Sequence, residues 1–440
     1  MNKTSFSVIA TFGICFAANA AVEIVSPANG TTVALLPEPQ KKIMSYATYE
    51  ERLAVLKADN AKPHDDRYYG KDRDSKWRLS VPLVLKWRTT DGESGPWLIR
   101  FGTTPDLADA TDTWLNPGEA AKMSMAKDEQ SSEKTDGKTH VYTYEMTYAN
   151  LELGRTYYWK VWSNAKCPKF SHGATVTAKC HCGNGRLAVP SATASFTTED
   201  QPPRWIRLEG RVKNVRDLGG WKTTDGRRVR QGMAFRGSGL NESSITGDKL
   251  GRNRLTAEDI SYMKDVLGIR TDLDLRTERE TAKADKSPLG DGVALVSCPF
   301  PAYEGLFVTK GFNEDLCPDV KKAMARIFRL FCDKKNYPIY FHCAGGADRT
   351  GSLAYVLNGV LGVTEHDVDV DWESTFYPKL PEIFEKHFNK DTWRQEQHFH
   401  RGFAAYGDTD TPLQRRIELY LFDCGVTQEE IDRFRAIMLE

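Results

Sequence analysis

The sequence lacks an excess of charge of either sign, because 60 Lys and Arg residues balance 60 Asp and Glu residues among 440. A neutral chain has no net field to attract nucleic acid or an anionic membrane, so neither partner is expected. No apolar run reaches the ~18 residues that span a bilayer, which argues against an integral membrane segment. Internal repeats are also missing. The 40% hydrophobic and 27% charged residues are typical of a folded chain with two or three domains.

The first twenty residues have the order of a secretory signal peptide. Lys3 precedes an apolar stretch from Phe6 to Phe16, and Ala18-Asn19-Ala20 supplies small residues for cleavage. The alternative, a buried N-terminal helix, does not explain this order. We therefore expect residues 1–20 to be removed and the protein to be exported to the periplasm, the cell surface or the medium.

Eight cysteines remain after the signal peptide, in a compartment that permits disulfides. Cys167 with Cys180 or Cys182 could close a loop, although sequence alone leaves the pairing open. With His181, these residues also offer four soft ligands for zinc. Their spacing differs from the usual ligand pairs, so a disulfide is favoured and no metal or cofactor is expected.

Residues 21–199 are rich in short segments that alternate apolar and polar residues, as at 82–88, 97–101, 141–146 and 156–162. Such strands separated by turns predict an antiparallel sandwich. The segments LKWRT, IRFGTTPDL, NLELGRTYYWKVW and SFTTED resemble a fibronectin type III-like domain, of the sort found ahead of secreted phosphoesterases. Residues 37–74 depart from this pattern. They are charged, with helical spacing, and are interpreted as an insertion in the sandwich.

Gln201-Pro202-Pro203 marks a boundary, and strands alternate with helices through residues 204–440. Strands are predicted at 268–276, 292–298 and 337–342, and helices at 320–333 and 349–361. This alternation predicts an α/β fold with a mostly parallel sheet flanked by helices. Because the diproline continues neither a strand nor a helix, the two domains are expected to fold independently.

The segment FHCAGGADRTG joins a predicted strand to a predicted helix through a glycine-rich turn. Such a turn directs backbone N–H groups into a concavity, and the helix N-terminus adds positive potential, so the segment predicts an anion cradle. The predicted cradle residues are His342, Ala344, Gly345, Gly346, Ala347 and Gly351.

Four side chains of this segment are the candidate catalytic groups. The pKa of a cysteine on the floor of such a cradle falls from ~8.5 to ~3.5–7.5, which makes Cys343 the candidate nucleophile. Arg349 can bind two phosphate oxygens through its planar fork. Thr350 could donate to the departing sulfur, and Asp348 is the fourth candidate. His342, a cradle residue, is expected to orient the loop through backbone hydrogen bonds.

The segment resembles the Cys-x5-Arg loop of the protein tyrosine phosphatase superfamily, and in particular the bacterial tyrosine/dual-specificity phosphatases with HCxxGKDRTG loops. NVRDLGG, MAFRGSGL, GIRTDLDLRTERE and LNGVLGVTEHDVDVDW match the same branch. The resemblance implies the tyrosine-phosphatase fold, hydrolysis of phosphomonoesters through a phosphocysteine, and Asp348 as the acid that protonates the leaving group. A mobile-loop acid, Glu304 or Asp315, is the alternative that the sequence leaves open.

One position departs from that branch, because Ala347 replaces its lysine. In the relatives this lysine is associated with multiply phosphorylated or lipid substrates, which puts phosphoinositide activity in doubt. The expected substrate is therefore a phosphorylated protein or a small phosphomonoester. Phytate and phosphoinositides are the enzymatic alternatives, and a phosphate-binding adhesion protein is the non-enzymatic one. Oligomeric state is not predicted.

Overall fold

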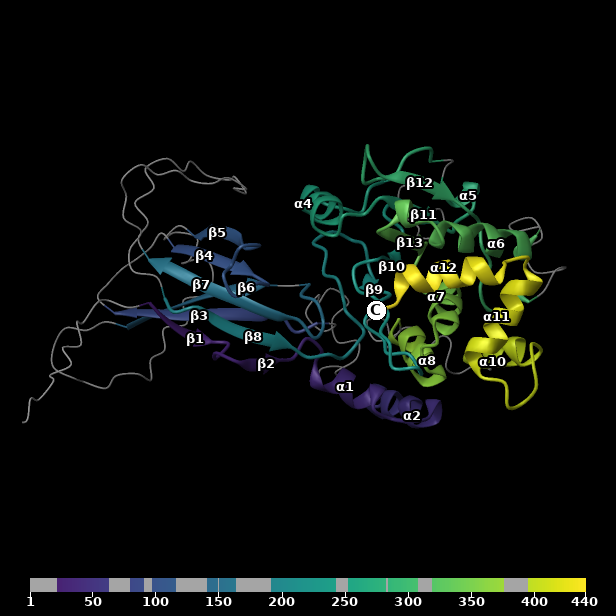
Figure 1. Ribbon diagram of the computed structural model, residues 1–440, viewed down its shortest axis with the longest axis horizontal. Coiled ribbons are helices and arrows are strands. Elements are labelled where there is room, and N and C mark those ends of the chain that lie inside the picture. The colour runs from purple at the N-terminus through teal and green to yellow at the C-terminus, as the bar shows by residue number, and fades with distance from the viewer. Residues whose placement is uncertain are drawn as a thin grey trace, which may run out of the picture. The chain divides into compact units, whose positions relative to one another are not determined.

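A computed structural model gives the fold (Figure 1). It describes residues 22–62, 80–90, 97–115, 141–148, 150–163, 191–242, 252–281, 284–307, 319–375 and 395–440. Contacts divide the chain into two compact units. The first comprises the residues before Ala34 with 84–147 and 156–197, and the second comprises 34–83, 148–155 and 198–440. The predicted signal peptide and Cys167, Cys180 and Cys182 lie outside the described residues.

The first unit contains two sheets, with strand orders β1-β3-β6 and β2-β8-β7-β4-β5. Their strands are β1 (Glu23–Ser26), β2 (Thr31–Val33), β3 (Leu83–Thr90), β4 (Trp97–Gly102), β5 (Thr111–Leu115), β6 (Val141–Tyr148), β7 (Thr156–Ser163) and β8 (Ala194–Thr198). The pairs β1–β3, β4–β5, β4–β7 and β7–β8 are antiparallel. Trp87 of one sheet and Trp97 of the other are buried with ring centroids 6.0 Å apart, so the sheets share an aromatic core. Its fibronectin-like kinship stays a prediction.

The second unit is built on a five-stranded sheet of order β12-β11-β13-β10-β9. The strands are β9 (Arg216–Asp217), β10 (Ala234–Ser238), β11 (Thr271–Asp274), β12 (Ala294–Ser297) and β13 (Ile339–Cys343). β10, β11, β12 and β13 pair in parallel, and β9 is an antiparallel edge. The predicted α/β fold with a mostly parallel sheet is therefore confirmed for this unit.

The two faces of this sheet bury different sets of side chains. Ile339 and Phe341 belong to the larger core, whereas Tyr340 lies in a smaller core with Phe235 and Met263. This alternation follows from the two-residue period of a strand, and it places hydrophobic layers on both faces.

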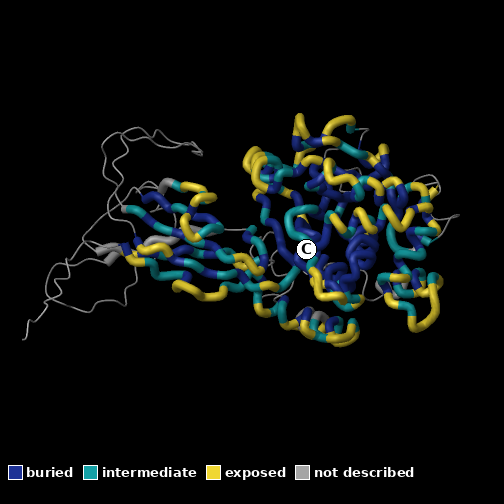
Figure 2. The backbone as a smooth tube through the Cα atoms, in the orientation of Figure 1, coloured by how far each residue is buried: buried dark blue, intermediate teal, exposed yellow. Residues whose placement is uncertain are grey.

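Helices and short turns cover these faces. They are α4 (Ala257–Ser261), the π-helical turn η2 (Tyr262–Val266), α5 (Glu278–Thr281), the 3-10 turns η3 (Tyr303–Leu306) and η4 (Lys334–Asn336), α6 (Val320–Phe331), α7 (Asp348–Leu361), α8 (Glu365–Ser374), α10 (Gln395–Ala404), α11 (Leu413–Asp423) and α12 (Gln428–Met438). Helix α7 is buried along almost its whole length (Figure 2). Gly362 ends it in the left-handed region, at φ 91°, and Thr364 caps the start of α8.

The N-terminal helices α1 (Glu38–Met44) and α2 (Tyr49–Asn60) belong to this second unit. Leu36, Ile43 and Met44 join its larger hydrophobic core, and α1 and α2 lie near α8 (Figure 1). The sequence interpreted residues 37–74 as an insertion in the sandwich, and α1 and α2 do lie between β2 and β3 in the chain. Their contacts belong to the second unit, because the apolar side of α1 is buried in the α/β core.

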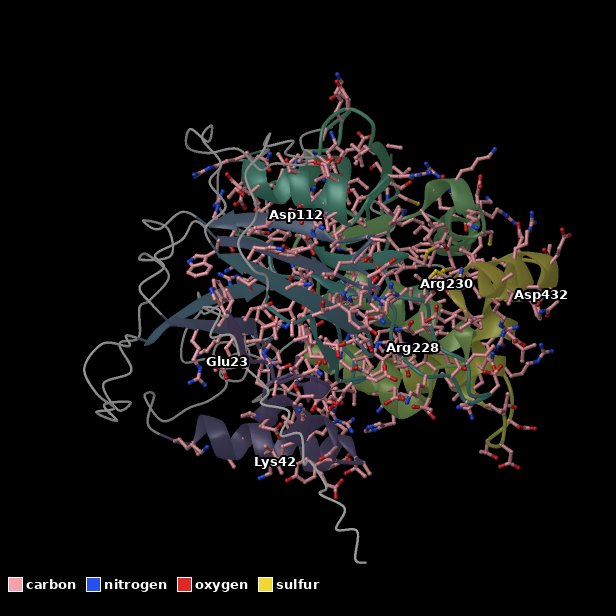
Figure 3. The ribbon with its side chains drawn as sticks, turned by 60° about the vertical axis from the view of Figure 1, so that its left-hand side comes forward. Glu23, Lys42, Asp112, Arg228, Arg230 and Asp432 are labelled. Carbon is pink, nitrogen blue, oxygen red and sulfur yellow. The ribbon has the colours of Figure 1, made fainter. Side chains whose placement is uncertain are left out.

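The C-terminus is held against residues 228–230 (Figure 3 labels Arg228 and Arg230). The Arg230 guanidinium donates to the carbonyls of Ile437 and Leu439 at 2.9 and 3.1 Å, and Val229 forms a bridge with Leu439. The end of α12 is thereby fixed to the core. Within the described ranges, no helix has the length and apolar character needed to cross a membrane.

Candidate active site

The predicted cradle lies where strand β13 ends and helix α7 begins, at the carboxyl edge of the parallel strands. Gly346 has φ +70°, and a Cβ there would lie 2.4–2.6 Å from the backbone of Gly237 and Ser238. A side chain cannot occupy that space. The turn is therefore restricted to glycine at position 346 by both conformation and close backbone approach.

Cys343 is the last residue of β13 and is buried at 2% exposure, opposite Ser238 of β10 in the parallel register. The other described cysteines, Cys298, Cys332 and Cys424, are also free thiols. Burial, the largest effect, raises the pKa of Cys332 and of Cys424 to about 12, so both stay protonated. Their placement fits small buried hydrophobic residues, whereas Cys343 lies in the cradle.

Arg349 is held by a residue that the sequence analysis did not single out, Glu280 of α5. Nη1 and Nη2 of Arg349 each donate to one Glu280 oxygen at 2.7 Å. The Leu275 carbonyl lies 3.5 Å from Nη1. Within the described chain these contacts use three of the five guanidinium donors, which leaves two for an oxyanion. Burial lowers the pKa of Arg349, but the bond to Glu280 and the charges of Glu280, Cys343 and Asp348 together outweigh burial, so the net pKa is raised.

Glu280 is itself held in place by Thr277. The Thr277 N–H and hydroxyl donate to Glu280 Oε2 at 2.9 and 3.0 Å. Burial raises the pKa of Glu280, and the bonds from Arg349 and Thr277 together lower it below its ordinary value. The carboxylate is therefore ionised and orients Arg349. The DLRTERE segment was the sequence signal for this partner, since it follows the strand next to β13.

His342 is oriented by acidic side chains of β11. Its Nε2 lies 2.8 Å from Asp272 Oδ1, and its Nδ1 lies 3.8 Å from Asp274 Oδ1. Asp274 also accepts from Arg276, at 2.7 Å to Nη2. The expected role of His342 was to orient the loop through backbone bonds. Among the described residues, the backbone contact of its ring is to the Cys343 carbonyl, at 3.4 Å, so its side chain is directed mainly by carboxylates.

Two side chains contact the carbonyl of Gly346. Asn214 Nδ2 donates at 2.8 Å, and Arg236 Nη2 lies at 3.5 Å. Asn214 accepts in turn from Arg216 at 2.6 Å. The motifs NVRDLGG and MAFRGSGL carry these residues, so sequence matching located them without revealing what they hold.

Asp348 is exposed at the first turn of α7 and accepts a hydrogen bond from the Tyr303 hydroxyl. Tyr303 has φ +53°, unusual for a bulky residue, and its N–H donates to Ser352 Oγ at 2.9 Å. Its ring meets Trp372 edge-on at 6.3 Å. Tyr303 therefore brings an aromatic side chain to the candidate acid. The alternative acids are not placed, since Asp315 and the Glu304 side chain lie outside what the structure describes.

The remaining loop residues differ in exposure. Ala344 and Ala347 are buried, Gly345 is half-buried, and the Ala344 carbonyl accepts from Arg254 at 3.3 Å. A Cβ on Gly351 would lie 2.9 Å from Trp372. The Thr350 hydroxyl is buried and has no hydrogen-bond partner among the described residues. It is thus available to a group in the cradle.

Residues 206–440, just over half of the chain, match the tyrosine phosphatase family. A Cupriavidus necator protein, provisionally named a tyrosine-protein phosphatase, is 26% identical over 205 residues, 42% of this chain and 68% of that one. The core catalytic domain of the PP-IP phosphatase SIW14 from S. cerevisiae, in complex with citrate, aligns over 33% of this chain and 84% of its own. That alignment has 15% identity and a TM-score of 0.21.

Proposed function

The chain belongs to the tyrosine phosphatase family, and from that premise we propose that it is an exported phosphatase that hydrolyses phosphomonoesters of the phosphotyrosine type through a phosphocysteine at Cys343. The observation that carries the proposal is the joint placement of three parts. Cys343 ends β13, Gly346 turns the chain, and Arg349 is fixed by Glu280 at the start of α7.

In the first step the Cys343 thiolate attacks phosphorus, and the bond from phosphorus to the leaving oxygen breaks. The free donors of Arg349 and the N–H groups at the start of α7 hold the equatorial oxygens. The leaving oxygen takes a proton from Asp348, which is exposed at the first turn of α7. Phosphocysteine and the free alcohol or phenol result.

In the second step water attacks the phosphocysteine, and Asp348 accepts the proton that the water loses. The bond from phosphorus to sulfur breaks, inorganic phosphate is released, and the Cys343 thiolate is regenerated. The Thr350 hydroxyl, buried and without another partner among the described residues, is suited to donate to the departing sulfur. These steps use only side chains and backbone groups of this chain.

The test compares substrates and one variant. Phosphotyrosine peptide, a small aryl phosphate, phytate and a phosphoinositide are assayed side by side with the native chain and with Cys343→Ser. We expect turnover of the first two substrates, and loss to background in the variant without loss of fold. Turnover of the variant near the native rate would refute the role of Cys343, and preference for phytate or phosphoinositide would revise the substrate class.

We also propose that the protein is exported and that its first domain is fibronectin-like. These proposals are supported by the N-terminal sequence order and by the paired antiparallel sheets of the first unit. N-terminal sequencing of the mature protein tests export directly. A mature chain beginning near Ala21 supports cleavage after Ala20, and a mature chain that keeps Met1 contradicts it.

A further inference from the structure

Two buried arginines beneath the cradle share one carboxylate. Arg216 Nε donates to Asp371 Oδ1 at 2.9 Å, and Arg236 Nη1 donates to Asp371 Oδ2 at 2.6 Å. Both arginines are 0% exposed and Asp371 is 3% exposed. This cluster, Arg216–Asp371–Arg236, therefore carries one positive charge that Asp371 does not balance.

An unbalanced buried cation costs stability unless something else compensates it. Burial and then Arg216 lower the pKa of Arg236 to about 9, against the opposing pull of Asp371. Arg236 Nε is also buried without a hydrogen-bond partner among the described residues. The cluster is thus poorly arranged for stability alone, because Arg216 and Asp371 would form a balanced pair without Arg236.

The position of Arg236 points to the cradle. Arg236 Nη2 lies 3.5 Å from the Gly346 carbonyl. A Cβ on Gly351 would lie 3.3 Å from this Nη2 atom. Arg236 is two residues before Ser238, which is paired with Cys343 in the sheet. The excess charge therefore lies under the turn that separates Cys343 from Arg349.

The other charged groups around the cradle have partners of opposite charge or hydrogen-bond partners of their own. These pairs are His342 with Asp272, Arg276 with Asp274, Arg349 with Glu280, Arg254 with Glu242, and Asp348 with Tyr303. Besides Asp371, the charge of Cys343 acts on Arg236 and raises the pKa of its guanidinium. A charge in a dry site acts on such a neighbour far more strongly than it does in water.

We propose that Arg236 is a positioning residue whose uncompensated positive charge stabilises Cys343 as a thiolate. The same side chain contacts the Gly346 carbonyl. The inference rests on the proposed function, in which the thiolate is the nucleophile. It assigns the buried strand β10, and not only the loop backbone, a part in activating that nucleophile.

The test follows the thiolate itself. Native protein, Arg236→Met and Arg236→Lys are alkylated with iodoacetamide across a pH series, and the modified Cys343 peptide is quantified by mass spectrometry. We expect Arg236→Met to raise the midpoint of alkylation by about one pH unit, or roughly tenfold slower reaction on the acid side. Arg236→Lys keeps the charge and should stay near the native midpoint.

A matched control breaks a buried ion pair that has no hydrogen bond to a described residue of the cradle. Arg204 Nη1 donates to Asp217 Oδ2 at 3.0 Å, and its other hydrogen bonds go to the Asn150 and Leu151 carbonyls. Arg204→Met should lower stability without moving the midpoint. Asp371→Asn should move it the other way, to lower pH, because both arginines are then unbalanced. If Arg236→Met does not fold, Arg236→Gln removes the same charge and keeps a donor for Asp371.

The proposal is overturned if the charge-removing variants leave the midpoint unchanged, or if Met and Lys shift it equally, since the effect would then be one of shape. The proposed function is tested separately by turnover of para-nitrophenyl phosphate in the native chain. A shifted midpoint without any native turnover would uphold the charge effect and refute the phosphatase assignment.

Discussion

Arg52 of α2 and Glu373 of α8, 321 positions apart in the chain, form a buried ion pair with two hydrogen bonds of 2.6 and 2.7 Å. Their side chains are 2% and 5% exposed. The same helix α8 carries Asp371, which binds the arginines beneath the cradle, and Trp372, which lies against Gly351. An N-terminal helix is therefore linked through α8 to the catalytic loop within one unit.

Removing one partner of this pair should be costly. We expect Arg52→Met to lower the free energy of unfolding by about 3–5 kcal/mol, because the buried Glu373 carboxylate would lose the guanidinium that donates two hydrogen bonds to it. Urea denaturation at neutral pH measures the change. The double variant Arg52→Met with Glu373→Met should recover most of the loss, and a single variant as stable as the native chain would show that the pair is unimportant.

The shape of the turn at Gly346 gives a second prediction, with a matched glycine elsewhere. Gly346→Ala and Gly226→Ala both place a Cβ at positive φ, which costs about 1–2 kcal/mol each. Only at position 346 would the Cβ meet backbone, since nothing lies within 4 Å of the Cβ position at Gly226. We expect kcat for an aryl phosphate to fall at least about tenfold in Gly346→Ala and to be unchanged in Gly226→Ala. Equal rates in the two variants would contradict the close-approach argument.

Much of this site was visible in the sequence for a definite physical reason. Strand, glycine turn and helix are local features, so β13, the loop and α7 could be predicted from FHCAGGADRTG and its flanks. Their partners were not local. Glu280 binds Arg349 across 69 positions, and Asp371 binds Arg216 across 155, distances over which residue patterns carry no pairing information.

The contacts of the N-terminal helices could not be predicted for the same reason. The helical spacing of residues 49–56 correctly indicated α2, and the segment was interpreted as an insertion in the sandwich. Nothing in that segment identified Glu373 as the partner of Arg52, so the sequence did not show which core the insertion joins. In the structure a buried charge pair, together with Ile43 and Met44, places it with the α/β core instead.

The bond between Tyr303 and Asp348 leads to a prediction on leaving groups. Asp348→Asn should slow alkyl phosphates by ~10²–10⁴-fold and aryl phosphates with acidic leaving groups far less, because only poor leaving groups need the proton. Tyr303→Phe should produce a smaller effect with the same selectivity, since it frees Asp348 from its positioning bond. Steady-state rates across a leaving-group series measure both.

The control for that series is a second tyrosine with the same kind of bond. Tyr406 donates to Asp423 at 2.7 Å and its ring contacts Tyr420, outside the cradle, so Tyr406→Phe should leave all rates unchanged. Equal slowing of alkyl and aryl substrates by Asp348→Asn would show that Asp348 only shapes the loop. The search for the acid would then move to Glu304 and Asp315.

His400 gives a prediction about pH and stability. Burial lowers its pKa, but the neighbouring carboxylates Asp369, at 3.2 Å, and Glu365, at 3.3 Å, outweigh burial and raise it. A raised pKa in the folded state stabilises below the unfolded value of ~6.5 and loses that effect as pH rises through the folded value. His400→Gln should therefore lower stability at about pH 5.5 and have little effect at about pH 9. A constant difference across this range would refute the ion-pair role.

The last prediction concerns a chain that begins near Gln201, the boundary that the sequence favoured. That chain lacks residues 34–62, which supply Leu36, Ile43 and Met44 to the larger core. It also lacks Arg52, so the buried Glu373 carboxylate would lose that guanidinium. We therefore expect low soluble yield and weak activity on a small aryl phosphate, in contrast to the independent folding that the diproline indicates. Adding Glu373→Met to the truncated chain should raise the yield in part, because it removes the buried carboxylate that has lost Arg52, whereas the apolar surface stays exposed. A truncated chain as soluble and active as the full one would show that α1 and α2 are dispensable, and would restore the boundary at Gln201.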